Sequence, residues 1–263
     1  MTSPPRSPQL SSNGARALEI DLIENIARWF GVSPERAPDI RQEAKQALQM
    51  PTLNHAGSAT MGWLATALAF DLSDSGDRLF PNGNRGMPLA LSHWVHRVAN
   101  EARTHRATGV HLALIERQIS DGRPFLQGDR LGLVDLMCRA IAKHARKDST
   151  SDELVASHFP HIADWLGRVD ESLRAAGDGG EKPSEAVGAW LYLPDQWPHD
   201  ESRLAAAPGA LMRGASVRIS MDRTPNASWE GTLYYASYDL VWACDADGLM
   251  CLFAALEVNI DPA

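Results

Sequence analysis

The chain has 263 residues, of which 44% are hydrophobic and eight are tryptophan, and its formal net charge is −8. This length accommodates one large domain or two to three smaller ones with a substantial core. The acidic balance and the lack of a Lys/Arg cluster argue against a nucleic-acid partner. No apolar run approaches the roughly 20 residues of a membrane span, and the Pro/Ser-rich start lacks the apolar core of a secretory signal. We therefore expect a cytoplasmic protein with no membrane partner.

The first 80 residues predict helices and give no clear sign of strands. Apolar residues at helical spacing predict a first helix over 15–30, ended by Gly31; they are Leu18, Leu22, Ile26 and Phe30. A second helix is expected over 39–49, and a helix of small residues over 59–70. No strand is evident before the first helix or directly after it, and the Pro and Ser content of residues 1–14 predicts a disordered segment or a loop.

The middle of the chain predicts a helical bundle, and the end predicts strands. Helices are expected over 87–120, 124–145 and 152–176. From Gly209 the hydrophobic pattern changes to alternation, which is typical of about five short strands. The expected fold class is mainly α, with four parts after the first loop: a reduced N-terminal part at 15–78, a helical bundle at 79–176, a linker at 177–208, and a small antiparallel β-barrel or sheet at 209–263.

The most distinctive pattern is a turn, a buried helix and a downstream tryptophan. It comprises Phe125, Leu126, Gly128, Asp129, Asp135, Pro160, Ile162 and Trp165. This pattern resembles the helical domain of the cytosolic glutathione S-transferases. The family has Ser or Thr where this chain has Gly132, and that residue caps the buried helix together with the Asp three positions later. We expect a structural role for Asp135, and a poorer cap at Gly132 that costs roughly a few tenths of a kcal/mol.

The resemblance implies a thioredoxin-like part that binds glutathione through three features. The first is a residue before the first helix that faces the cofactor sulfur; Ser12 and Asn13 are the catalytic candidates, and Ser11 adjoins them. The first strand of such a domain is not evident in this chain. The N-terminal part is therefore expected to be truncated or degenerate.

The other two features bind the cysteinyl and γ-glutamyl groups of glutathione. A cis-proline segment in the family corresponds to Met50, Pro51 and Thr52. A Glu/Gln-Ser pair at a helix start is missing here, and Ser58 and Thr60 are the nearest hydroxyls. These five residues, together with Ser11, are the candidates for binding the cofactor.

The resemblance also implies a reaction. A free thiol has a pKa of about 8.5, and a hydroxyl donor would stabilise the thiolate, which attacks electrophilic carbon. Release of the adduct makes a transferase, whereas addition to a conjugated olefin, bond rotation and expulsion make a cis–trans isomerase. Some fungal polyketide-tailoring proteins of this family act in the second way. We expect such an isomerase, acting as a homodimer on a small apolar electrophile, with Trp63 and Trp94 lining the substrate pocket.

Simpler interpretations stand beside these. Ser12 can be a helix cap, Pro51 an ordinary turn proline, and the two tryptophans core residues. The missing Glu/Gln-Ser pair favours a non-catalytic docking module, and a glutathione-independent lyase or isomerase is a third reading. Cations near the long helices, such as His96 and Arg97, form a solvated face or meet the carboxylates of glutathione. The cysteines lack metal-ligand spacing, so no metal is expected.

Overall fold

The computed structural model describes most of the chain as two compact units. The described residues are 8–12, 15–37, 48, 50–55, 58–73, 78–83, 85–100, 105–146, 158–178, 211, 214–221, 224–236 and 240–263. The sheet unit comprises Met1–Ala15, Ser33–Ser73 and Pro183–Ala263, and the helical unit comprises Arg16–Val32 and Asp74–Lys182. Nearly all of the helix expected over 39–49 and of the linker expected over 177–208 lies outside the described residues.

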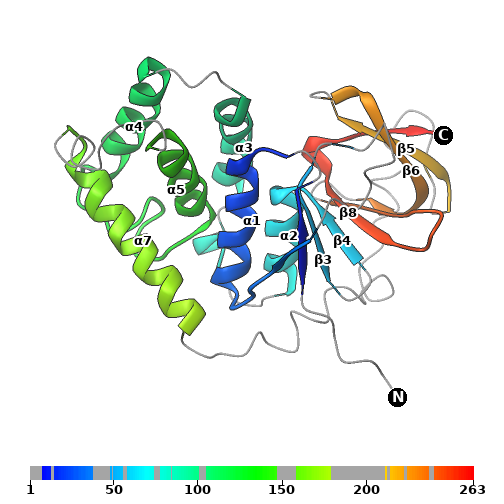
Figure 1. Cartoon of the computed structure of the whole chain (residues 1–263), viewed down its shortest axis with the longest axis horizontal. Coiled ribbons are helices and arrows are strands. Elements are labelled where there is room, and N and C mark those ends of the chain that lie inside the picture. Colours follow the sequence, from blue (N-terminus) through cyan, green and yellow to red (C-terminus); the bar gives the residue numbers. More distant parts are fainter. Residues whose placement is uncertain are drawn as a thin grey trace. The chain divides into compact units, whose positions relative to one another are not determined.

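The helical unit is a bundle around one buried helix. Its helices are α1 (Ala17–Trp29), α3 (Gly86–Asn100), α4 (His105–Ile119), α5 (Leu133–Arg146) and α7 (Pro160–Asp178), with a short 3-10 turn at Pro81–Gly83. Helix α5 contacts α1, α3, α4 and α7 (Figure 1). Its residues from Leu133 to Ala142 are all buried, as expected for a helix with apolar residues on most of its surface.

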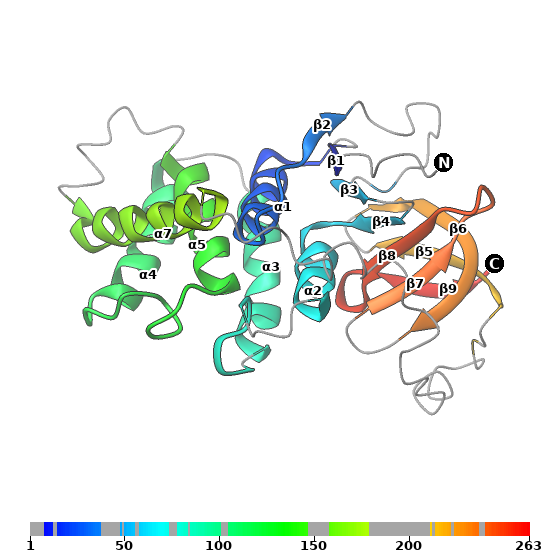
Figure 2. The same cartoon turned by 90° about the horizontal axis from the view of Figure 1, so that it is seen from below.

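The sheet unit contains one nine-stranded sheet. Its strands are β1 (Gln9–Ser11), β2 (Glu35–Ala37), β3 (Thr52–His55), β4 (Ser58–Met61), β5 (Ser216–Met221), β6 (Thr224–Ala236), β7 (Leu240–Cys244), β8 (Met250–Ala254) and β9 (Asn259–Pro262). They follow the order β2-β1-β3-β4-β8-β7-β6-β5-β9 (Figure 2). The N-terminal and C-terminal strands join where β4 pairs in parallel with β8. Helix α2 (Trp63–Ser73) packs against both of these strands.

The structure corrects the expectation that the N-terminal strands are absent. β1 pairs in parallel with β2 and antiparallel with β3, and β1 lies within the segment expected to be a loop. Each of the first two strands has only three residues, which is too few for an alternating pattern to be recognised. In β2, Glu35 and Arg36 are exposed, so this edge strand lacks an apolar signature. The helix expected over 59–70 is strand β4 followed by α2, which starts at Trp63.

The C-terminal strands are not a separate small barrel. Their core includes Val217, Trp229 and Phe253, and the same cluster contains Met50 and Ala59 from the N-terminal part. The five C-terminal strands were predicted, but their continuation into the N-terminal sheet was not. The fold is therefore a combination of a helical bundle and a mixed sheet rather than mainly α.

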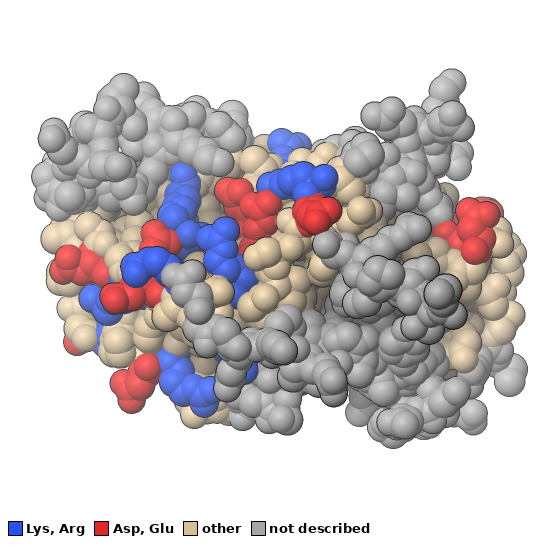
Figure 3. Space-filling view, turned by 60° about the horizontal axis from the view of Figure 1, so that its bottom comes forward, with Lys and Arg blue, Asp and Glu red and all other residues tan. Residues whose placement is uncertain are grey.

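Two further features of the described residues are the distribution of surface charge and the apolar character of the helices. On the face that Figure 3 shows, basic side chains lie among acidic ones in the coloured area rather than in a separate patch. Among the helices described, none combines the length and the apolar character that crossing a bilayer requires.

Candidate functional site

One end of the sheet gathers several of the predicted site residues. Ser11, the last residue of β1, lies opposite Thr52, the first residue of β3. Thr52 also lies opposite Met61, the last residue of β4, and Met61 lies beside Phe253 of β8. The segments that follow or precede these residues therefore converge here. We call this the site end of the sheet: Ser11–Ser12, Met50–Thr52, Met61–Trp63 and the turn after β8.

Ser12 lies in the turn after β1 and does not cap the first helix. Its carbonyl oxygen accepts a hydrogen bond from the amide of Ala15 at 2.8 Å. Helix α1 starts at Ala17 with Arg16 at the N-cap position, and no side chain caps it. The half-buried Ser12 thus stands in the turn where the resemblance puts the sulfur-facing residue. Asn13, the second catalytic candidate, lies outside the described residues.

The Met50–Pro51 segment is present, but its peptide bond is trans. Within the described residues the structure has no cis peptide bond, which corrects the implied cis-proline; trans is favoured at X–Pro bonds by about 0.5–1 kcal/mol. The Met50 amide donates to the Leu48 carbonyl at 2.8 Å, and the Pro51 carbonyl accepts from the Gly62 amide at 2.8 Å. The Met50 amide and the Pro51 carbonyl are therefore already hydrogen-bonded within the sheet unit.

The remaining candidate hydroxyls are buried, and those with described contacts bond inside the sheet unit. The Thr60 hydroxyl lies 2.7 Å from that of Thr66 in α2, and the Thr52 hydroxyl donates to the Met50 carbonyl at 3.4 Å. Ser58 is also buried, at the other end of β4 opposite His55. Three residues along a strand correspond to about 10 Å, so the structure separates Ser58 from the site end.

A carboxylate that sequence reasoning missed lies at the start of α2. Glu257 ends a 3-10 turn, Ala255–Glu257, that follows β8. Gly62 precedes α2 with φ at +93°, and a Cβ atom there would lie 3.2 Å from Glu257 Oε2 and 2.6 Å from Met50 Cε. Gly62 thus leaves space that the Met50 side chain and the Glu257 carboxylate fill. Nothing in the local sequence points to this contact, because it depends on the pairing of β4 with β8.

The two tryptophans proposed for the substrate pocket belong to different units. Trp63 of α2 is fully buried in the sheet unit. Trp94 of α3 is half-buried in the helical unit and donates its indole N–H to His111 Nδ1 at 3.1 Å. Of the cations near it, His96 lies 3.0 Å from the buried Glu19 carboxylate, whereas Arg97 is exposed.

Asp135 has the structural role expected of it. Its carboxylate accepts hydrogen bonds from the Leu126 amide at 2.8 Å, the Gly132 amide at 3.2 Å and Trp165 Nε1 at 2.9 Å. Burial raises the pKa of Asp135 to about 6, although the three donors oppose this rise. Packing explains why glycine occupies position 132, because a Cβ atom there would lie 2.7 Å from the ring of Pro81. The Ser or Thr of the family does not fit at this position.

Two observations concern the thiol of Cys138 and the grouping of potential metal ligands. Cys138 is buried, and desolvation raises the pKa of its thiol far above the usual value, so this thiol is inert. No group of three potential metal ligands occurs among the described residues.

Comparisons with known proteins bear on the fold. No protein-family model matches the sequence, and no curated protein sequence matches it. A GST-like protein from Pseudomonas syringae is similar over 98% of this chain and 99% of that chain, with a TM-score of 0.64 and 14% identity. A glutathione transferase from Bombyx mori is similar over 71% of this chain and 98% of that one, with a TM-score of 0.50 and 15% identity. At these identities the likeness establishes a glutathione transferase-like fold and nothing finer.

Proposed function

We propose that the protein binds glutathione at the site end of the sheet unit and uses its thiol against a small apolar electrophile. The fold provides the context for this proposal. The observation that carries it is the convergence, at one end of the sheet, of the Ser12 turn with the Glu257 carboxylate beside Gly62.

The chain's own residues suit the polar groups of glutathione in two places. The Glu257 carboxylate can accept charge-assisted hydrogen bonds from the γ-glutamyl ammonium, at the helix start where the family uses a Glu/Gln-Ser pair. The Ser12 hydroxyl can donate to a thiolate and so lower the pKa of the thiol. When bound, glutathione would supply the nucleophilic sulfur.

The finer proposal is cis–trans isomerisation of a conjugated olefin in a small polyketide-type substrate, and the alternative is conjugation of a small electrophile. The two reactions differ in whether glutathione is consumed. Incubation with a cis-enone and with a chlorodinitrobenzene, while free thiol is measured over time, separates them. Isomerised enone with constant thiol supports the isomerase, and loss of thiol in step with product supports the transferase.

A second candidate function is a non-catalytic docking module. Two observations favour it: the Met50 amide is engaged by the Leu48 carbonyl, and the hydroxyls of Thr52 and Thr60 bond within the sheet unit. In a docking module these groups need only hold the fold together. Such a protein would not bind glutathione.

Calorimetric titration with glutathione tests the proposal directly. We expect binding in the micromolar to low millimolar range for the unaltered protein. Glu257→Gln should weaken binding by about tenfold through the loss of a charged acceptor, whereas the exposed Glu230→Gln, the matched control, should not change it. Ser12→Ala should retain affinity but raise the pKa of the bound thiol, followed by thiolate absorbance. No heat at several millimolar would overturn the proposal in favour of the docking module.

A further inference from the structure

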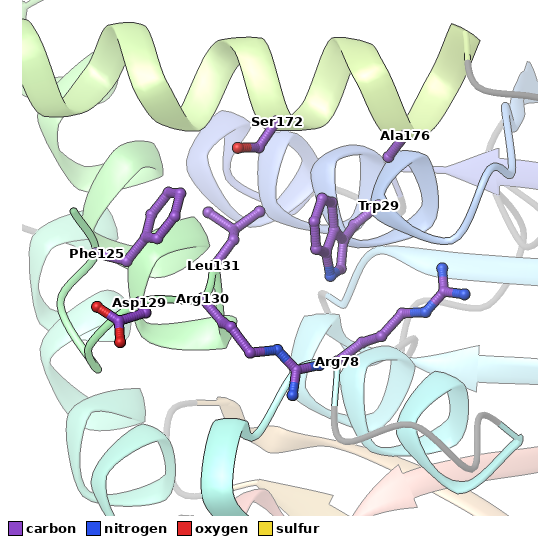
Figure 4. A pocket seen from close by; sticks show the side chains of 8 residues that line it. All are labelled: Trp29, Arg78, Phe125, Asp129, Arg130, Leu131, Ser172 and Ala176. Atoms are coloured by element: carbon purple, nitrogen blue, oxygen red, sulfur yellow. The ribbon is translucent and has the colours of Figure 1, made fainter.

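The helical unit contains a cavity that the proposed function does not use. Its volume is about 400 Å³, within the range of about 300–1,000 Å³ that is typical of small-molecule sites. The walls come from the end of α1, the segment before α3, the loop before α5, and α7 (Figure 4). The residues that matter for its chemistry are Trp29, Arg78, Phe125, Arg130, Leu131 and Ala176.

One side of the cavity carries hydrogen-bond donors. Trp29 Nε1 is buried and has no hydrogen-bond acceptor among the described residues. Figure 4 shows the indole nitrogen on the ring edge that faces the side chains of Arg78 and Arg130. The Arg78 guanidinium also packs over the ring of Phe30, 5.7 Å from its centroid, which helps to fix its position. An oxygen-rich anion would give the indole N–H an acceptor and would meet both guanidinium groups.

The described lining residues offer few competing acceptors. Asp129 is the single acidic residue among them, and Figure 4 shows its carboxylate turned away from Trp29. The Ser172 hydroxyl is committed to the Arg168 carbonyl at 2.9 Å within α7. Among the described lining residues, two guanidinium groups therefore stand against one carboxylate.

The opposite side of the cavity is apolar and preformed. Phe125 and Leu131 supply it from a loop that is held by its own hydrogen bonds. Phe125 and Gly128 exchange backbone hydrogen bonds at 3.0 and 3.1 Å, and Arg168 Nε donates to the Pro124 carbonyl at 3.2 Å. A ligand body that packs here does not have to order the loop, which lowers the cost of binding.

We propose that this cavity binds a small organic anion with a flat apolar body. Its carboxylate or similar oxyanion lies against Arg78, Arg130 and Trp29 Nε1, and its body packs against Phe125 and Leu131. All the lining residues belong to the helical unit, so binding does not depend on glutathione or on the site end of the sheet.

The test uses naphthoate as the probe and naphthalenemethanol as its neutral counterpart. The indole N–H resonance of Trp29 is assigned from its loss in Trp29→Phe and followed during each titration. We expect naphthoate to shift this resonance and to bind about tenfold more tightly than the alcohol. Arg78→Ala and Arg130→Ala should each weaken naphthoate binding severalfold and leave the alcohol unchanged. Arg174→Ala, which removes an exposed arginine of α7, is the matched control.

Several results would overturn the proposal. They are equal affinity for acid and alcohol, naphthoate binding that leaves the Trp29 resonance unmoved, and an equal loss of affinity in Arg174→Ala. Displacement of naphthoate by glutathione would also overturn it, because the two sites would then be one. If a thermal unfolding measurement shows that an alanine variant is not folded, Arg130→Lys replaces it. This substitution keeps the charge but loses the planar fork, so a smaller loss of naphthoate affinity is expected.

Discussion

The helices α5 and α2 both begin in buried surroundings, but the acidic group at each start comes from a different distance along the chain. At α5, the Asp135 carboxylate accepts the amides of Gly132 and Leu126, its near neighbours in the sequence. At α2, the residue before the helix is Gly62, and the carboxylate beside it belongs to Glu257, after β8. A local pattern can encode the first arrangement. The second exists only after the sheet has formed.

The largest loss of stability in this comparison is expected when the Asp135 carboxylate at the start of α5 is removed. Asp135→Ala leaves three buried donors without an acceptor, and each unsatisfied donor costs about 1–3 kcal/mol. We expect the free energy of unfolding to fall by about 3–5 kcal/mol, measured by chemical denaturation. Asp129→Ala, an exposed position in the same loop, should change it by less than about 0.5 kcal/mol. Similar small effects at both positions would contradict a structural role for Asp135.

The raised pKa of Asp135 predicts how stability depends on pH. The folded-state pKa of about 6 lies above the ordinary value of 3.8. The folded state therefore holds a proton that the unfolded state releases. The contribution of the protonated Asp135 to the free energy of unfolding is present in full below pH 3.8 and is lost as pH rises through about 6, a change of about 3 kcal/mol. Asp135→Asn cannot titrate, so the difference in unfolding free energy between the two proteins should shrink by this amount from about pH 4 to pH 7. A difference that grows with pH would contradict the sign.

The same contrast explains how much the sequence could predict. The helices of the helical unit and the five C-terminal strands were recognisable, because their hydrophobic periods extend over enough residues. β4 was not, because Ser58, Ala59 and Thr60 are all buried. α2 covers one face of this strand and the core cluster covers the other, and the four residues of β4 are too few for the alternation of Ser and Thr with Ala and Met to be recognised. Its small residues suggested a helix instead.

The candidate site was predictable only in part for a similar reason. Ser11, Ser12, Met50, Pro51 and Thr52 meet at the site end because β1 pairs with β3 in a register that puts Ser11 opposite Thr52. The trans bond at Pro51 is the generally favoured isomer, and the buried Thr52 and Thr60 hydroxyls bond within the sheet unit. The position of Glu257 follows from the pairing of β4 with β8, and no motif in either segment predicts that pairing.

Gly132 offers a sharper test of the α5 start. Serine is a better N-cap than glycine, so the sequence pattern favours Gly132→Ser as a stabilising change. The structure predicts the opposite, since the new Cβ atom would lie 2.7 Å from the Pro81 ring. We expect a loss of about 1–3 kcal/mol, measured by denaturation. Combining Gly132→Ser with Pro81→Ala should cost less than the sum of the two single changes, and strict additivity would show that Pro81 is not the obstacle.

The smallest effect is expected at the start of a third helix. Its acidic group comes from a neighbouring helix, which is intermediate between the local carboxylate of α5 and the distant one of α2. The first turn of α7 receives its acceptor from Glu116 of the neighbouring α4. The Glu116 carboxylate takes the His161 amide at 3.1 Å and the Ile162 amide at 2.9 Å, while Pro160 at the first helical position has no N–H to satisfy. Glu116→Ala should lower the free energy of unfolding by about 1 kcal/mol.

Two further variants separate this capping role from charge alone. Glu116→Gln keeps one oxygen acceptor for the two amides, so it should lose less stability than Glu116→Ala. Glu171→Ala removes an exposed carboxylate from α7 itself and should have almost no effect on unfolding. If Glu171→Ala cost as much as Glu116→Ala, the contribution of Glu116 would be general electrostatics.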